Sequence, residues 1–197
     1  MNRGRITRER LLEVAVRAAG SVGLEGLTIG ALAHSAEMSK SGVFAHFDSK
    51  EELQLAVLAS ARQRFIQDVL EPSYEAPVGS PRLHALFERW MDWAEGKSVP
   101  GGCPILAAAL EFSGRPGVVR DRVAHVQGEL TTAVEKTVKM AVEEGHFRLD
   151  VDVVQIAYQM HCLALGFQLR HHLLRRTDAR ACTRAAFDHL VGFASKS

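Results

Sequence analysis

Apolar residues recur along most of the chain at the three- and four-residue spacing of an amphipathic helix, and the alternation typical of strands is almost absent. From about Thr7 to Gly20 an apolar stripe marks a first helix. Its members are Leu11, Val14, Ala15, Ala18 and Val22. The pattern predicts an all-α protein of about nine helices.

Capping residues divide the first part of the chain into short elements. Thr28 is expected to cap a second helix, and Ser39 a short third helix that ends near Phe47. Ser49, followed three residues later by Glu52, forms a capping box that opens a long fourth helix. Three small helices therefore precede a connecting helix.

A larger helical bundle is expected after a linker. Residues 71–82 hold three of the six prolines and form the best linker candidate, with Ser80-Pro81 as the start of the next helix. A second break at residues 96–104 precedes further helices, the last of which covers roughly residues 178–194. We predict a helix-turn-helix domain at residues 1–48, followed by a helical bundle at residues 49–197.

Bulk composition restricts the class of protein. Apolar residues make up 47% of the chain and charged residues 24%, which is ordinary for a globular protein. There is no apolar run near the ~18 residues of a membrane span, and no apolar region follows the basic N-terminus as in a signal peptide. The three cysteines are widely spaced and suit a reducing compartment. A cytoplasmic protein is therefore expected.

Positive charge is concentrated at the N-terminus, although the formal net charge is only +1. Arg3, Arg5, Arg8 and Arg10 accompany a single acid, Glu9. A basic arm at a chain end commonly contacts phosphate, but a frayed, solvated terminus has the same composition. The arm leaves both interpretations open.

Residues 28–47 have the layout of a helix-turn-helix. Two short helices joined by a tight turn allow the first to pack and the second to enter a DNA major groove, roughly 12 Å wide. Helices under ~12 residues are marginal in water, so they need a third packing wall. The apolar stripe of the first helix supplies that wall, and this motif predicts DNA binding.

The stretch from Arg8 to Leu58 resembles the DNA-binding domain of the tetracycline-repressor (TetR) family. The resemblance rests on RLLEVAVRAA, GLEGLTIGALA and MSKSGVFAHFDSKEEL, in this order. The segment GGCPILAAALEFSGRPGVVRD also resembles one found in a branch of such regulators. The resemblance implies a homodimeric transcriptional repressor that a small-molecule inducer releases from a palindromic operator, with no further cofactor.

The resemblance also implies roles for individual residues. Side chains expected to meet phosphates are those of Thr28, Ser39, Lys40 and Lys50. Residues expected to face base edges are Ser41, Gly42, Phe44, Ala45 and His46. Val43 and Phe47 are expected to point into the small core.

The expected reading helix departs from the family pattern. Phe44 lacks the hydroxyl of the usual tyrosine, and Gly42 and Ala45 have no hydrogen-bonding side chain. Sequence preference is therefore expected to depend on thymine-methyl contact, close backbone approach and DNA shape. The alternatives are an activator or ligand-independent repressor, and a helical small-molecule-binding protein with a vestigial helix-turn-helix.

Histidines and cysteines form no convincing chemical site. His161-Cys162 and His171-His172 are adjacent pairs, whose side chains point about 100° apart on a helix and chelate poorly. No nucleophile motif or phosphate loop is present, so neither a metal site nor an enzyme is predicted. Cys103 lies at a predicted helix start, where either a packed thiol or a redox-sensing one fits.

Two residues of the larger bundle are candidates for a ligand cavity. Trp90 and His161 combine an apolar body with a polar atom that can orient a ligand, although plain core packing is the alternative.

Apolar rows on the last two helices predict a four-helix dimer interface, although the first row can equally serve burial within the chain. The rows are Val153, Ala157, Met160, Ala164 and Phe167, then Ala181, Ala185, Leu190, Val191 and Ala194.

Overall fold

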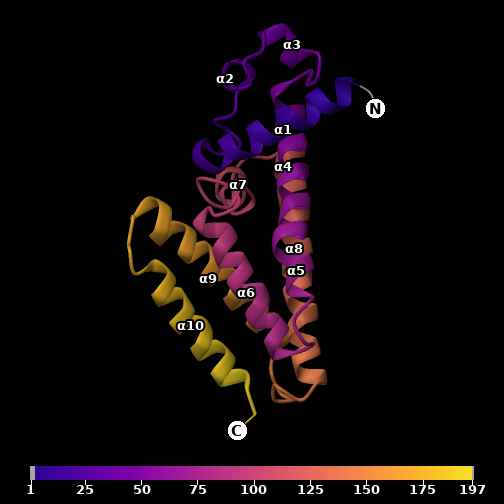
Figure 1. The fold of residues 1–197 in the computed structure, drawn as a ribbon. Coiled ribbons are helices and arrows are strands. Elements are labelled where there is room, and N and C mark those ends of the chain that lie inside the picture. Colours follow the sequence, from indigo (N-terminus) through magenta and orange to yellow (C-terminus); the bar gives the residue numbers. More distant parts are fainter. Residues whose placement is uncertain (1–2, 197) are drawn as a thin grey trace. The chain divides into compact units, whose positions relative to one another are not determined.

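Helices form wherever the sequence carries apolar residues at helical spacing, in a computed structural model that describes residues 3–196 (Figure 1). Because α4, η1 and α5 follow one another without a break, as do α9 and η2, these residues form nine helical segments, which confirms the predicted all-α fold. The first elements are α1 (Arg3–Val22), α2 (Ile29–Ser35), α3 (Lys40–Phe44), α4 (Lys50–Phe65), η1 (Ile66–Leu70) and α5 (Glu71–Ser73). They are followed by α6 (Ser80–Glu95), α7 (Pro104–Phe112), α8 (Val118–Glu143), α9 (Val153–Gln168), η2 (Leu169–Leu173) and α10 (Ala179–Ala194).

The chain divides into two compact units that are not the two halves of the sequence. The first unit comprises Met1–Arg64 and Val99–Val126, and the second comprises Phe65–Ser98 and Gln127–Ser197. Helix α7 and the start of α8 thus belong to the first unit, together with α1 to α4. The predicted boundary after residue 48 separates a DNA-binding part from the remaining bundle by function, and it stays a prediction.

The core of the first unit forms between α1, α2 and α3. Leu11 and Ala15 of the predicted stripe are buried, but Val22 is exposed. Val16 and Ala19, which were not part of the predicted stripe, are buried. The packed face of α1 includes residues 11, 15 and 19, which are spaced four apart. The apolar stripe therefore lies on the predicted helix. Near the C-terminal end of that helix, however, the buried side chain is that of Ala19 and not that of Val22.

The predicted linker is shorter than expected. The fourth helix continues through the wide turn η1 into α5, which ends at Ser73, so the irregular stretch before α6 begins only at Tyr74. Pro72 lies inside this helical run. The π-helix η1 ends at Leu70, two residues before Pro72, which has no N–H to donate.

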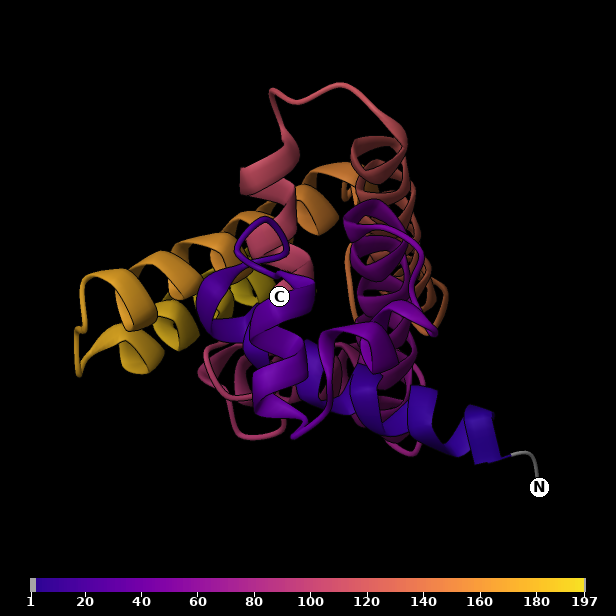
Figure 2. The ribbon, with the colours of Figure 1, turned by 90° about the horizontal axis from the view of Figure 1, so that it is seen from above.

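In the second unit, α9 packs against both α6 and α10, and α9 and α10 run side by side (Figures 1 and 2). The apolar row of α9 faces inward, since Ala157, Met160, Ala164 and Phe167 are buried. This row therefore serves burial within the protomer, which was the alternative to a dimer contact. The apolar face of α6 is also buried, as the periodicity predicts; it consists of Leu83, Leu86, Phe87, Trp90 and Trp93.

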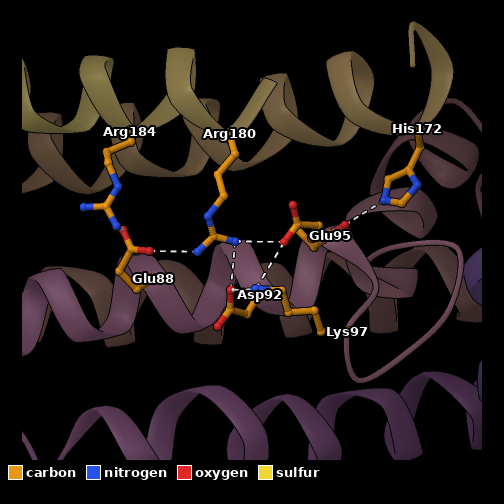
Figure 3. Close-up of polar contacts among 8 residues, drawn as sticks. Glu88, Asp92, Glu95, Lys97, His172, Arg180 and Arg184 are labelled. Atoms are coloured by element: carbon orange, nitrogen blue, oxygen red, sulfur yellow. Dashed lines mark hydrogen bonds and ion pairs between the residues drawn. The ribbon is translucent and has the colours of Figure 1, made fainter. Parts of the chain in front are cut away.

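A cluster of charges joins α10 to α6 (Figure 3). The guanidinium of Arg180 lies 2.8 Å from carboxylate oxygens of Glu88 and Asp92 and 3.0 Å from one of Glu95. Arg184 also pairs with Glu88. Partial burial disfavours the charged form of Asp92, but hydrogen bonds, including that from Arg180, outweigh it and hold the pKa of Asp92 below its ordinary value. The cluster fixes the register of α10 against α6.

Within residues 3–196, no helix has both the length and the apolar character needed to cross a membrane.

Candidate nucleic-acid interface

Both helices of the predicted helix-turn-helix begin with the expected caps. The hydroxyl oxygen of Thr28 accepts the N–H of Ala31 at 3.1 Å, at the start of α2. The hydroxyl oxygen of Ser39 accepts the N–H of Gly42 at 3.0 Å, at the start of α3. The two caps satisfy first-turn donors that such short helices would otherwise leave to solvent.

The turn between α2 and α3 contains a strained residue. Glu37 has a φ of 54°, in the left-handed region that glycine adopts more easily. The next N–H, of Met38, donates to the carbonyl of Ala33 at 2.9 Å and closes the turn. The path from α2 into α3 is therefore set by backbone hydrogen bonding despite the unfavourable residue.

Helix α3 is anchored from its inner side. Val43 and Phe47 are fully buried, as predicted. The guanidinium of Arg8 on α1 lies 5.0 Å from the centre of the Phe47 ring and 3.9 Å from a carboxylate oxygen of Glu52. Arg8 of α1 therefore contacts the Phe47 ring and also pairs with the first turn of α4.

The outer side of α3 carries small and apolar groups. Ser41 and Ala45 are exposed, Phe44 is 48% exposed, and Gly42 and His46 are half-buried. The hydroxyls of Ser39 and Ser41 lie 3.1 Å apart, so the Ser41 hydroxyl is already partnered. The small side chains on this face let another surface come close to the helix backbone, but they offer no long side chain that could form a hydrogen bond with it.

The two predicted phosphate-binding lysines have different environments. Lys40 lies across α2, because a methyl group added at Gly30 would come 3.3 Å from its Cε atom. Lys50 donates a hydrogen bond of 2.9 Å to Glu25. Sequence reasoning missed both partners, since neither Gly30 nor Glu25 belongs to a local motif with its lysine.

Glu25 is held as a carboxylate by several donors. The hydrogen bond from Lys50 keeps the pKa of Glu25 below its ordinary value, Gln54 and Arg115 act in the same direction, and partial burial opposes them. Glu25 is therefore charged at neutral pH beside the lysine that was expected to meet DNA.

The basic arm is the first part of α1. The helix begins at Arg3, whose side chain lies outside the described part of the chain. Arg5 lies 3.8 Å from Glu9, and Arg10 is exposed. Within the described residues the arm is helical, and its contact with phosphate stays a prediction.

The two predicted ligand-contacting residues lie against each other in the second unit. The rings of Trp90 and His161 meet edge to face with centres 5.6 Å apart, and Phe65 contacts both Trp90 and Trp93 in the same way. Within residues 3–196, Nε1 of each tryptophan and Nδ1 of His161 are buried without a hydrogen-bond partner. Burial lowers the pKa of His161, so its ring is neutral at pH 7.

Unpartnered buried donors need an explanation. Leaving a buried polar group without a hydrogen bond costs about 1–3 kcal/mol. The two unpartnered indole N–H groups lie in one aromatic cluster, which Phe65 joins. In the described part of the chain, no three residues among the histidines, cysteines, aspartates and glutamates are grouped so as to hold a metal ion.

Comparison with protein families matches the two parts of the chain separately. Residues 11–57 match the family described as bacterial regulatory proteins, tetR family. Residues 79–187 match the tetracyclin repressor-like C-terminal domain. No curated protein matches the chain.

Solved structures share the fold over nearly the whole chain. A TetR transcriptional regulator from Chloroflexus aurantiacus J-10-FL is 25% identical with a TM-score of 0.86, and the match covers 98% of this chain and 96% of that one. A TetR-family regulator from Cytophaga hutchinsonii is 21% identical with a TM-score of 0.85, covering 100% and 98%. AibR, solved with isovaleryl coenzyme A and operator DNA, is 20% identical with a TM-score of 0.71, covering 96% and 98%.

Proposed function

The chain belongs to the tetR family of bacterial regulatory proteins, and from this premise we propose that it is a dimeric repressor released from a palindromic operator by a small-molecule inducer. The family consists of DNA-binding regulators rather than enzymes. The observation that carries the proposal is the capped α3, anchored through Val43 and Phe47 with Ser41 and Ala45 facing outward. We assign DNA binding to residues 1–48, regulation to residues 49–197, and a cytoplasmic location.

Helix α3 reads the major groove in this proposal. Its small residues allow the backbone to approach base edges, and the ring of Phe44 and the methyl of Ala45 suit thymine methyl groups. Gly42 has no side chain and the methyl group of Ala45 offers no hydrogen bond, so sequence preference depends on these apolar contacts and on DNA shape. The residues assigned to base edges are Ser41, Gly42, Phe44, Ala45 and His46, and those assigned to phosphates are Thr28, Ser39, Lys40 and Lys50.

A second copy of the chain is proposed to cover the groove between α9 and α10. Dimerisation is typical of the family. The groove has a volume of about 590 Å³ and includes Gln159, Cys162, Leu163 and Phe193 among its lining residues. Phe193 is 70% exposed, and the nearby apolar Tyr158 on α9 is 60% exposed. Exposed apolar side chains beside a groove favour an interface at this place.

The inducer is proposed to bind beside Trp90 and His161. The two indole N–H groups and a neutral imidazole favour an apolar molecule that carries hydrogen-bond acceptors such as carbonyl oxygens. AibR, which shares the fold, was solved with a thioester ligand, isovaleryl coenzyme A. Helix α6 bears Trp90, and the Arg180 cluster ties α6 to α10 (Figure 3). A ligand that moves α6 would therefore also move the proposed dimer face.

Release from DNA requires two geometries of the dimer. Half-sites on one face of DNA lie about one helical turn, ~34 Å, apart. A ligand that binds more tightly to a dimer with a different spacing shifts the population away from the DNA-bound form. Without that difference in affinity, ligand binding would not change the fraction of dimers in the DNA-bound geometry.

Selection of duplexes from a random pool by the purified protein tests this function. The expected product is a palindrome with half-sites about one turn apart, recovered at ~150 mM salt. Binding that is blind to sequence at every salt concentration, or no binding, would contradict an operator reader and favour a ligand-binding protein with a vestigial helix-turn-helix.

Replacing Trp90 by phenylalanine is expected to weaken inducer binding about tenfold, because an aromatic side chain remains at this position but the indole N–H donor is lost. Affinity for the selected duplex should be unchanged. The chain has two tryptophans, both in this cluster, so their fluorescence can report binding in a screen of small apolar carbonyl compounds. In Trp90→Phe the remaining Trp93 serves as the reporter.

The control for this variant is Tyr74→Phe, which removes a polar atom from a half-exposed aromatic residue of the same unit. It should bind the inducer like the wild type. Equal inducer affinity in Trp90→Phe and wild type would remove Trp90 from the proposed site.

A further inference from the structure

Glu25 lies between two cations in the first unit. One carboxylate oxygen, Oε1, accepts a hydrogen bond from Lys50 at 2.9 Å. The other, Oε2, lies 3.4 Å from a guanidinium nitrogen of Arg115 and accepts from the amide of Gln54 at 3.2 Å. Each oxygen therefore has its own partners, and the Arg115 side can persist when Lys50 leaves.

The segment around α7 holds Glu25 in this position. The carboxylate of Glu111 accepts the backbone N–H groups of Leu24 at 2.9 Å and Glu25 at 3.2 Å. A side chain at Gly23 would overlap the Glu111 carboxylate, so the loop after α1 fits closely around it. Glu111 and Arg115 thus position both the backbone and the side chain of Glu25.

Both ion pairs of Glu25 are accessible to solvent and to a competing anion. The side chains of Lys50, Glu25 and Arg115 are 42%, 43% and 56% exposed. Exposed pairs of this kind contribute little net stability, so a DNA phosphate can replace Glu25 on Lys50 at small cost. A phosphate near Lys50 is also repelled by the Glu25 carboxylate as long as that carboxylate stays beside the lysine.

From this arrangement we propose that Glu25 is an internal competitor for Lys50, and that Arg115 controls how strongly it competes with DNA. When Arg115 holds the carboxylate, Lys50 is available to phosphate. When the segment after α7 withdraws Arg115, the full charge of Glu25 acts on Lys50 and DNA binding weakens. The inference rests on the proposed DNA-binding function, and gives the segment 111–115 a regulatory role in it.

The test measures binding to a mixed-sequence duplex of about 30 base pairs, because a phosphate contact does not depend on sequence. Glu25→Gln is expected to tighten binding about three- to tenfold at ~100 mM salt, since the competing charge is removed and the side chain keeps its shape. Fluorescence anisotropy of the labelled duplex gives the dissociation constant, and thermal unfolding verifies that the variant folds.

Two further variants make the effect specific. In a Lys50→Met background, Glu25→Gln is expected to give no gain, because the cation it competes for is absent. Arg115→Gln is expected to weaken binding two- to threefold, on the order of one exposed ion pair, in the wild type and not at all in the Glu25→Gln background. Glu51→Gln, which removes an exposed glutamate next to Lys50, controls for the general loss of negative charge.

Distinct results overturn the inference. The inference fails if Glu25→Gln tightens duplex binding equally with and without Lys50, or if Glu51→Gln tightens it to the same extent. Either result would mean that the loss of any nearby negative charge has this effect. A loss in Arg115→Gln that persists without the Glu25 charge would make Arg115 a direct phosphate ligand. If wild type binds this duplex and Glu25→Gln gains nothing, only the inference fails; if no variant binds any duplex, the proposed function fails with it.

Discussion

Replacing Phe193 by glutamate is expected to convert the dimer into monomers and to weaken binding to the selected operator at least a hundredfold, on the order of the avidity that two linked half-sites provide. The substitution places a carboxylate in the proposed α9–α10 interface, where desolvation of a charge is costly. It should not harm the protomer, because Phe193 is 70% exposed and the guanidinium of Arg148 lies 4.9 Å from its ring.

Light scattering after size-exclusion chromatography reports the oligomeric state, and operator titration reports the affinity. The control is Val118→Glu, which adds the same charge at an exposed apolar residue at the start of α8 and should remain dimeric. A Phe193→Glu variant that stays dimeric would place the interface elsewhere. A monomeric variant with unchanged operator affinity would show that dimerisation is not needed for reading DNA.

Introducing glutamate at Ala45 is expected to weaken binding to every duplex, by about one to two orders of magnitude per half-site. Ala45 is exposed and has right-handed helical geometry at the end of α3, so a longer side chain fits without strain. Its carboxylate would lie among DNA phosphates if α3 enters the major groove. Like charges at ~4 Å repel by about 1–4 kcal/mol, depending on the local dielectric.

Ala45→Gln is the matched control, since it has the same shape without the charge. It should retain sequence-independent binding at low salt and change only which sequences are preferred, because an amide can accept or donate to base edges. Thermal unfolding of the two variants should coincide. Wild-type affinity in Ala45→Glu would mean that this face of α3 does not approach DNA.

Local signals in the sequence were sufficient for the helices and for the layout of the reading motif. Thr28 and Ser39 cap helices in the structure as expected, with hydrogen bonds to N–H groups three residues later. Val43 and Phe47 are buried as expected. These features were predictable because capping and helical periodicity involve residues within one or two turns of each other.

Tertiary structure decided which distant groups meet. The pairing of Glu25 with Lys50 and with Arg115 joins residues that have no common motif, and its Arg115 side depends on α7 belonging to the first unit. The edge-to-face contact of Trp90 and His161 likewise depends on α6 packing against α9.

The face of α9 used within the protomer could not be read from its periodicity. Helix α9 has apolar residues on more than one side: Met160 is buried, whereas Val154 and Tyr158 are exposed. Periodicity gives the positions of apolar residues along a helix, but it does not say which neighbour covers each side. The sequence by itself thus determined the helices, their caps and the reading motif. The partners of Lys50, the inward side of α9 and the grouping of α7 with the N-terminal helices followed only from the three-dimensional path of the chain, because such contacts depend on packing between elements far apart in sequence.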